Sequence, residues 1–129
     1  MVVTKEGEVY SFGNGRMGQL GHGDSNSQLL PKRVEGLQGR RVTQISAGRQ
    51  HALALTENGR VYAWGNGEFN RTGHGCPSNQ RVPKLVEAVR SKTIIEVSAG
   101  YCSSAVMTDR GKVIDFFDED VSSDEEDGY

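Results

Sequence analysis

The sequence has few of the residues that build disulfide scaffolds, metal centres or membrane spans. Its 129 residues include two cysteines, three histidines and one tryptophan. Cys76 and Cys102 lack the Cys-x-x-Cys spacing of zinc and redox motifs, so we interpret them as free thiols. No apolar run approaches the roughly 18 residues of a membrane-spanning helix, and no secretory signal pattern opens the chain. We therefore expect an intracellular protein, cytoplasmic or nuclear, without membrane association or a metal site.

The groups that catalysis and cofactor binding require are also absent. No serine or cysteine lies beside a candidate base in the sequence, so nucleophilic catalysis has no candidate. Residues 13–18 match Gly-x-Gly-x-x-Gly, but a phosphate-binding loop needs a helix directly after its glycines. Residues 19–23, Gln-Leu-Gly-His-Gly, cannot begin a stable helix. We interpret these glycines as turns and expect neither an enzyme nor a bound cofactor.

Glycine, in contrast, is abundant, and it recurs with a fixed period. A comparison of residues 7–58 with 59–110 gives 18 identities in 52 positions without a gap, most of them glycines or strand residues. The shared segments include Gly-His-Gly at 21–23 and 73–75 and Ser-Ala-Gly at 46–48 and 98–100. A period near 50 with several short strands per unit is typical of propeller blades, whereas helical repeats lack this density of glycine.

The pattern within each period predicts a series of short strands. We expect inner strands near 42–47 and 94–99, and further strands at 8–12, 51–56, 60–64, 104–108 and from 112. We expect a polar connection over 24–31 and short outer strands at 32–35 and 84–87. Trp64 and Tyr62 should be largely buried between strands. The repeat pattern is expected to stop where Asp115-Phe116-Phe117 follows the last strand.

These motifs resemble the regulator of chromosome condensation repeats. The matching segments are Gly-x-Val-Tyr-x-Phe/Trp-Gly at 7–13 and 59–65, Gly-Gln-Leu-Gly-His-Gly at 18–23, and Ser-Ala-Gly-x-x-His-Ala-Leu-Ala at 46–54. The resemblance implies four-stranded blades and, in the usual family member, a closed ring of seven. It also implies that His51 joins adjacent strands through hydrogen bonds.

The chain holds little more than two blades' worth of repeat. We therefore predict an all-β fold, a partial β-propeller of roughly two four-stranded antiparallel blades plus flanking strands. Propeller repeats occupy 1–114, with full periods at 7–58 and 59–110 and a truncated third repeat. Because stacked repeats need neighbours, we expect Val9, Ile95 and Val97 to be exposed at open faces unless further blades cover them. Those blades would come from a longer chain, from copies of this chain or from another subunit.

Residues 115–129 form an acidic tail with eight carboxylates and no basic residue. The formal charge of the whole chain is -2, whereas residues 1–114 carry 15 basic and 9 acidic side chains. A solvated tail is one interpretation. The alternative is that the tail lies on a basic surface of this chain or of a partner. Ser122 and Ser123 each precede an acid by three residues, which makes them candidate phosphorylation sites.

Two classes of function compete. The first is a non-catalytic protein-interaction module that docks partner proteins through its loops. The alternative, implied by the resemblance, is a nucleotide exchange factor for a Ran-like small GTPase with chromatin association. Exchange in the family uses a protruding insertion, which the gapless period lacks, and direct nucleic-acid binding is not expected. The interface candidates are the loop residues Arg16, Met17, Phe69 and Arg71, because Arg, Met and aromatic side chains are enriched at interfaces.

Overall fold

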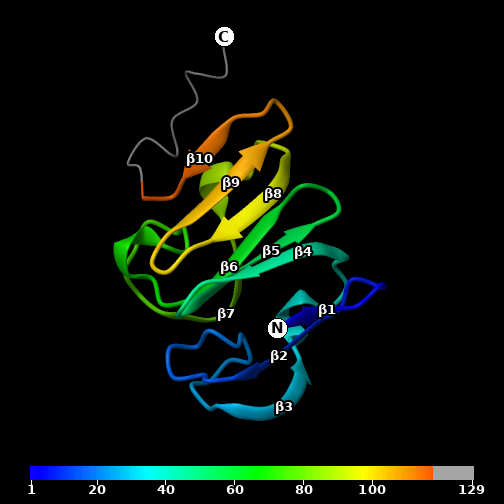
Figure 1. Cartoon of the computed structure of the whole chain (residues 1–129), viewed down its shortest axis with the longest axis vertical. Helices are drawn as coiled ribbons and strands as arrows, with labels where there is room; N and C mark the ends of the chain where they lie inside the picture. The colour runs from blue at the N-terminus through cyan, green and yellow to red at the C-terminus, as the bar shows by residue number, and fades with distance from the viewer. Residues whose placement is uncertain (118–129) are drawn as a thin grey trace.

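The computed structural model describes residues 1–117, which fold into three antiparallel sheets that follow one another along the long axis of the molecule (Figure 1). We name the sheets blades 1, 2 and 3. Blade 2 has four strands, and the flanking blades show three each in this part of the chain, so the predicted all-β, partial-propeller fold is confirmed. Blade 1 contains β1 (Val2–Val3), β2 (Val9–Gly13) and β3 (Gln28–Arg33), blade 2 contains β4 (Val42–Ala47), β5 (His51–Thr56), β6 (Val61–Gly65) and β7 (Gln80–Leu85), and blade 3 contains β8 (Ile94–Ala99), β9 (Ser104–Thr108) and β10 (Val113–Asp115).

The apolar core lies between the blades rather than within one layer. Strand β5 is buried along its whole length, and its side chains alternate between two clusters. Ala52 and Ala54 face blade 1, where they pack with Val9, Val34 and Trp64. The other face of β5 carries Leu53 and Leu55, which pack with residues of blade 3 that include Val97, Val106 and Phe116. The core therefore consists of contacts between neighbouring blades, as in other stacked repeats.

The predicted inner strands are confirmed as β4 and β8, but the outer strands begin earlier than predicted. Strands β3 and β7 occupy part of the expected polar connection, and the predicted strands at 32–35 and 84–87 run instead into short 3-10 turns, η1 (Glu35–Leu37) and η3 (Glu87–Val89). The residues of β3 and β7 are exposed or half-buried, so these strands tolerate proline and polar residues and show little apolar alternation. The helical segments within residues 1–117 are turns of this kind, and none could cross a bilayer.

An aromatic residue recurs at the junction between blades. Phe12, Trp64 and Phe116 are spaced by 52 residues, and Trp64 and Phe116 have no exposed surface. A glycine loop from the preceding blade covers each of these two rings. A Cβ atom on Gly21 would lie 2.9 Å from Nε1 of Trp64, and one on Gly73 would lie 2.6 Å from the Phe116 ring. The repeat thus continues through Phe116, beyond the end that the sequence predicts, while Tyr62 is only half-buried.

Phe12 occupies the same register position in blade 1 but is 43% exposed. It lies on the face of blade 1 that points away from blade 2, which we call the leading face. Within residues 1–117 no glycine loop covers this face. Apolar side chains on blade 1 that share this exposure are Val2 (49%), Leu29 (95%) and Leu30 (76%). The counterparts of Val2 and Phe12 in blade 2, Ala54 and Trp64, are fully buried.

The prediction that Val9, Ile95 and Val97 are exposed is wrong for two of the three. Val9 is 1% exposed, because the segment that follows β3 folds over it and the amide of Val34 donates to its carbonyl at 2.8 Å. Val97 is 7% exposed because it points toward blade 2. Ile95 is 46% exposed, as predicted.

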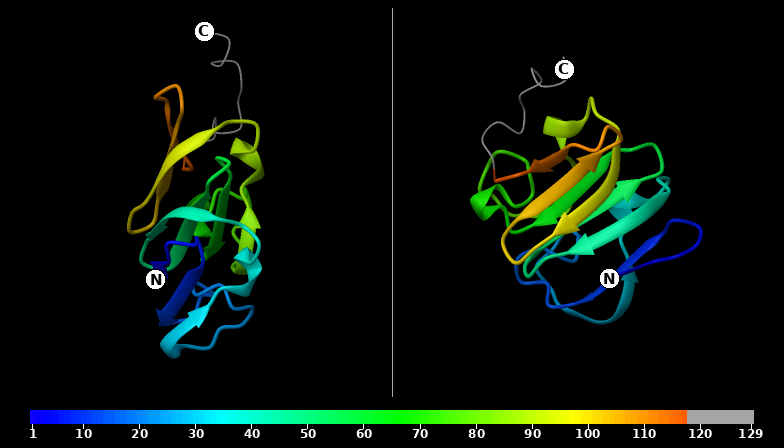
Figure 2. Two further views of the ribbon diagram at one scale, coloured as in Figure 1. Left: turned by 90° about the vertical axis from the view of Figure 1, so that its right-hand side faces the viewer. Right: turned by 45° about the horizontal axis from the view of Figure 1, so that its top comes forward.

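The turns and loops that connect the strands lie at two opposite ends of the blades (Figure 2). One end, the hairpin face, is formed by residues 5–8, 38–41, 57–60, 90–93 and 109–112. Its turns connect neighbouring blades: the amide of Val42 donates to the carbonyl of Gly7 at 3.1 Å, and that of Ile94 to Gly59 at 3.2 Å. The opposite end, the loop face, is formed by residues 14–27, 48–50, 66–79 and 100–103.

Candidate functional site

The loop face contains all four interface candidates, and hydrogen bonds between its segments hold it together. The amide of Asn66 donates to the carbonyl of Gln50 at 2.8 Å, so the long loop after β6 is fixed to the β4–β5 hairpin. The Ser104 hydroxyl of blade 3 donates to the carbonyl of Arg71 at 2.6 Å. Loops of blades 2 and 3 therefore form one continuous surface.

Phe69 is the most distinctive residue on this surface. Its ring is 62% exposed, and its backbone has φ 60 and ψ 22, the left-handed region that side chains other than glycine rarely adopt. The next residue, Asn70, also has a positive φ of 55. Its counterpart in the first repeat is Gly18, whereas the counterpart of Phe69 is Met17, whose φ is not positive. Left-handed backbone of this kind costs about 1–3 kcal/mol and persists where surrounding contacts enforce it.

The contacts that enforce this conformation come from the Asn70 side chain. Its Nδ2 donates to the carbonyl of Phe116 at 2.6 Å, and its Oδ1 accepts from the amide of Gly75 at 2.8 Å. In addition, the amide of Glu68 donates to Asn66 Oδ1 at 2.8 Å. The Phe69 ring is thus presented by a rigid loop.

Arg71 is buried, whereas the frequency of arginine at interfaces led us to expect an exposed side chain. It is 4% exposed, its Nε donates to the carbonyl of Glu68 at 3.0 Å, and its guanidinium lies 5.8 Å from the centre of the Phe69 ring. Arg71 therefore supports the Phe69 loop from beneath. A direct contact between its side chain and a partner would require the loop to open.

Arg16 and Met17 lie in the corresponding loop of blade 1. Arg16 is exposed, and its amide donates to Asn14 Oδ1 at 2.9 Å. Met17 is half-buried, with its sulfur 3.7 Å from Nδ2 of Asn79, whose Oδ1 accepts from the amide of Gly67. The structure therefore brings Met17 to the base of the Phe69 loop and leaves Arg16 beside it. Ser122 and Ser123 lie outside the described residues.

A second aromatic on the loop face was missed by the sequence interpretation. Tyr101 is 65% exposed, and the Arg49 guanidinium lies 5.0 Å from the centre of its ring. The two residues occupy the same register position, 52 residues apart, in the hairpins of blades 2 and 3. An aromatic and an arginine at one repeat position on neighbouring blades was a usable signal for this cation–π contact.

The family resemblance implied that His51 joins adjacent strands, and the hydrogen bonds of this buried side chain join blades 2 and 3. Nε2 of His51 lies 2.8 Å from Ser104 Oγ and 3.1 Å from the carbonyl of Ser103. Burial, together with a smaller effect of the nearby Arg71 charge, lowers the pKa of His51 to about 4, although the contact with the Ser103 carbonyl acts in the opposite direction. The pKa values of His22 and His74 are also lowered by burial. These side chains are neutral near pH 7.

The Ser104–His51 contact corrects the expectation that no serine lies beside a base, and Ser11 likewise lies 2.9 Å from His22. Neither serine is arranged as a nucleophile. The hydroxyl of Ser11 donates to the carbonyl of Leu20, and that of Ser104 to the carbonyl of Arg71, so neither proton is directed at the histidine. Ser104 is also buried. In residues 1–117, no group of three or more potential metal-ligating side chains occurs, and both cysteines are free.

Comparison with known proteins places this geometry in context. A family model described as regulator of chromosome condensation (RCC1) repeat matches residues 6–55 and 58–107. A curated relative, the human E3 ubiquitin-protein ligase HERC2, is 41% identical over 120 residues, which is 93% of this chain and 2% of that protein.

Solved structures give the same result for the fold. Human WBSCR16 superposes with a TM-score of 0.81 at 30% identity, covering 88% of this chain and 29% of that one. Saccharomyces cerevisiae Prp20p, described with its binding properties to Gsp1p and histones, superposes with a TM-score of 0.72 at 22% identity and covers 98% of this chain and 31% of that one. The chain therefore spans less than a third of the length of each of these proteins.

Proposed function

The chain belongs to the regulator of chromosome condensation (RCC1) repeat family, and from that premise we propose that it is a non-catalytic protein-interaction module, part of an RCC-type propeller that docks partner proteins through its loop face. The presentation of the Phe69 ring carries this proposal. An exposed aromatic side chain on strained, rigidly held backbone has no evident value for stability, whereas such anchors dominate the energetics of interfaces. Tyr101 and Arg16 supply further contact residues, and Met17 and Arg71 support the surface.

The replacement Phe69→Gly separates function from stability. Glycine adopts φ 60 without strain, so we expect the free energy of unfolding to rise by about 1 kcal/mol. Binding of partner proteins should fall more than about tenfold, because the aromatic anchor is lost. Urea denaturation measures the first effect, and quantitative affinity purification with the full chain measures the second.

The matched control is Val113→Ser, which removes an exposed apolar side chain from β10, next to the hairpin face. It should leave the recovered partners unchanged. Equal loss of partners in both variants would contradict docking through the loop face, and a fall in stability for Phe69→Gly would contradict the strain argument.

We also propose that further RCC-type repeats cover the leading face of blade 1. Two contacts between neighbouring blades support this proposal. The loop at 18–23 covers Trp64, and the loop at 70–75 covers Phe116. A segment with the same glycines would cover Phe12. One period further along the sequence, the corresponding positions are residues 122–127, which contain no glycine. Because a second copy could not supply that loop from blade 3, we favour repeats of another chain segment over head-to-tail copies of this one.

The exposed leading face should make the isolated chain self-associate at micromolar concentration, because large uncovered apolar patches drive association. The double variant Phe12→Ser/Leu30→Ser should shift the mass measured by light scattering toward that of a monomer. Val82→Ser changes the counterpart of Leu30 in blade 2 and should leave the mass unchanged. A parent chain that is a monodisperse monomer at micromolar concentration would contradict the proposal.

We propose that the chain consists of propeller repeats followed by an acidic tail. The predicted boundary between residues 114 and 115 is moved beyond Phe116, because that ring is buried as part of blade 3. The exchange-factor alternative has no supporting feature in residues 1–117. The loops over 14–27 and 66–79 have equal lengths, and neither carries the insertion that exchange would require.

A further inference from the structure

The hairpin face differs from the loop face in its charge. Its five segments contain eight basic side chains and four acidic ones, Glu6, Glu8, Glu57 and Asp109. The loop-face segments contain three basic and two acidic side chains, and one of the basic ones, Arg71, is buried. The excess positive charge of residues 1–114 is therefore concentrated at the end of the blades opposite the proposed protein-docking face.

A pocket at this end lies at the junction of blades 1 and 2. It has a volume of about 200 Å³ and is formed by the connection at 39–41, the turn at 56–60 and Tyr62. The Arg40 guanidinium lies 5.1 Å from the centre of the Tyr62 ring, and Arg60 lines the same pocket. The single acidic residue of the lining, Glu57, pairs with Arg41 at 3.7 Å. Among residues 1–117, neither Arg40 nor Arg60 has a carboxylate within ion-pair distance.

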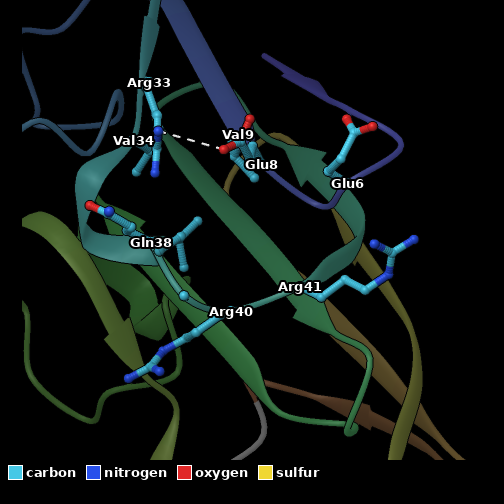
Figure 3. Close-up of a pocket in the computed structure, with 10 residues that line it drawn as sticks. Glu6, Glu8, Val9, Arg33, Val34, Gln38, Arg40 and Arg41 are labelled. Atoms are coloured by element: carbon cyan, nitrogen blue, oxygen red, sulfur yellow. Dashed lines mark ion pairs between the residues drawn. The ribbon is translucent and has the colours of Figure 1, made fainter.

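In the adjacent pocket on this face, carboxylates balance the charge of an arginine (Figure 3). It has a volume of about 330 Å³ and shares the segment at 39–41 with the first pocket. Arg33 is paired there with Glu8 at 3.5 Å, and Glu6 lies nearby. Arg40 and Arg41 leave the shared segment in opposite directions (Figure 3). Arg41 donates to the carbonyl of Lys5 at 2.7 Å and pairs with Glu57, which leaves Arg40 for the Tyr62 pocket.

The combination of two arginines and a tyrosine occurs once in the described repeats. One repeat later, the counterparts of Arg40, Arg60 and Tyr62 are Lys92, Lys112 and Ile114. Lysine does not offer the planar fork that binds a carboxylate through two hydrogen bonds, and isoleucine cannot stack beneath a guanidinium. The difference between the repeats therefore affects the chemistry of this junction and not the fold.

We propose that the Tyr62 pocket binds a carboxylate side chain of an acidic peptide segment of a partner protein, with Arg40 held over the Tyr62 ring and Arg60 as the donors. A guanidinium fixed over an aromatic ring loses less side-chain freedom when it forms the paired hydrogen bonds. Acidic residues interleave with the basic ones along the hairpin face, which opposes the continuous phosphate backbone of a nucleic acid. Discrete carboxylates spaced along a peptide avoid that repulsion.

The test uses the full chain and fluorescence anisotropy with a labelled Glu-Gly repeat peptide. We expect saturable binding that weakens with added salt, and little binding of the matched Gln-Gly peptide. The double variant Arg40→Gln/Arg60→Gln should weaken binding of the Glu-Gly peptide at least about tenfold, since two charge-assisted contacts are lost. Tyr62→Phe should keep the affinity within about twofold, because the ring remains beneath Arg40.

The control Lys32→Gln/Lys84→Gln removes the same charge from the outer strands β3 and β7 and should change the affinity by less than about twofold. Circular dichroism melts establish that all variants fold. An equal loss of affinity in the two double variants would overturn the site in favour of net charge alone. Tighter binding of a short DNA duplex than of the Glu-Gly peptide would overturn the choice of ligand. Because these changes avoid the loop face, failure here leaves the proposed docking function unaffected.

Discussion

Replacement of Trp64 by alanine is expected to lower the free energy of unfolding by about 3–5 kcal/mol, the usual cost of deleting a large buried aromatic side chain. The indole has no exposed surface, and its Nε1 donates to the carbonyl of Gln19 at 2.8 Å. The substitution would therefore leave a cavity between blades 1 and 2 and an unpaired carbonyl beside it. A domain of this size is stable by only about 5–15 kcal/mol, so the variant should be close to unfolding at ambient temperature.

The repeat supplies a matched control for this experiment. Phe12 has the same register position in blade 1, yet it is 43% exposed because no loop covers it. Phe12→Ala should cost about 1 kcal/mol or less, since little buried area is lost. Trp64→Phe should recover much of the stability, because phenylalanine fills this position at residue 116. Urea titrations followed by far-ultraviolet circular dichroism measure the stability of all three variants. Tryptophan fluorescence is not suitable, because two of the variants lack the only tryptophan.

Equal losses for Trp64→Ala and Phe12→Ala would show that the two positions have the same environment, which would contradict the exposed leading face. A loss confined to Trp64→Ala would show that a glycine loop from the preceding blade is what converts an exposed aromatic into a core residue. The same comparison, repeated in the presence of further repeats, would report whether Phe12 becomes buried.

The repeat pattern allowed the strands of the blades to be predicted because it combines two strong signals. Glycines fix the turns, as at Gly59 with its φ of 82, and β-branched or alternating apolar residues mark the strands between them. The inner strands β4 and β8 were therefore predicted with correct bounds. The outer strands β3 and β7 were misplaced because their residues are exposed or half-buried and therefore carry no such alternation.

Contacts between blades were much less accessible from the sequence. The contact of His51 with Ser104, the stack of Arg49 on Tyr101 and the Gly73–Phe116 packing join residues more than 40 positions apart, and each depends on how the blades pack. Arg71 was expected to be available to partners because arginine is common at interfaces. Its burial depends on the direction of one side chain, which turns toward the carbonyl of Glu68.

The left-handed backbone of Phe69 gave no sequence signal at all, since phenylalanine avoids that conformation. The candidate surface could thus be predicted as a set of divergent loop residues. The left-handed backbone that presents Phe69 could not be predicted. That feature arises from the Asn70 side chain and its bond to the carbonyl of Phe116, a contact between blades 2 and 3.

Acidification is expected to destabilise the fold through His51. This side chain is 1% exposed, and its pKa in the folded state is about 4, below the unfolded value of 6.5. Between these values the unfolded chain binds a proton that the folded chain excludes, so stability falls as the pH falls. The contribution of His51 is fully present above pH 6.5, declines through the interval and levels off below about pH 4. The total loss from this residue is about 3 kcal/mol.

The variant His51→Gln isolates this effect. Its stability near pH 7 should be lower than that of the parent, because the contacts with Ser103 and Ser104 are disturbed. Its stability should, however, depend less on pH between 6.5 and 4, because no proton is excluded at this position. His22→Gln is the control, since His22 is half-buried whereas His51 is buried. Urea titrations at a series of pH values in this interval provide the measurement. If the parent and His51→Gln lost stability in parallel as the pH fell, the acid sensitivity would arise from other groups, and His51 would not be the neutral link between blades 2 and 3 that its burial requires.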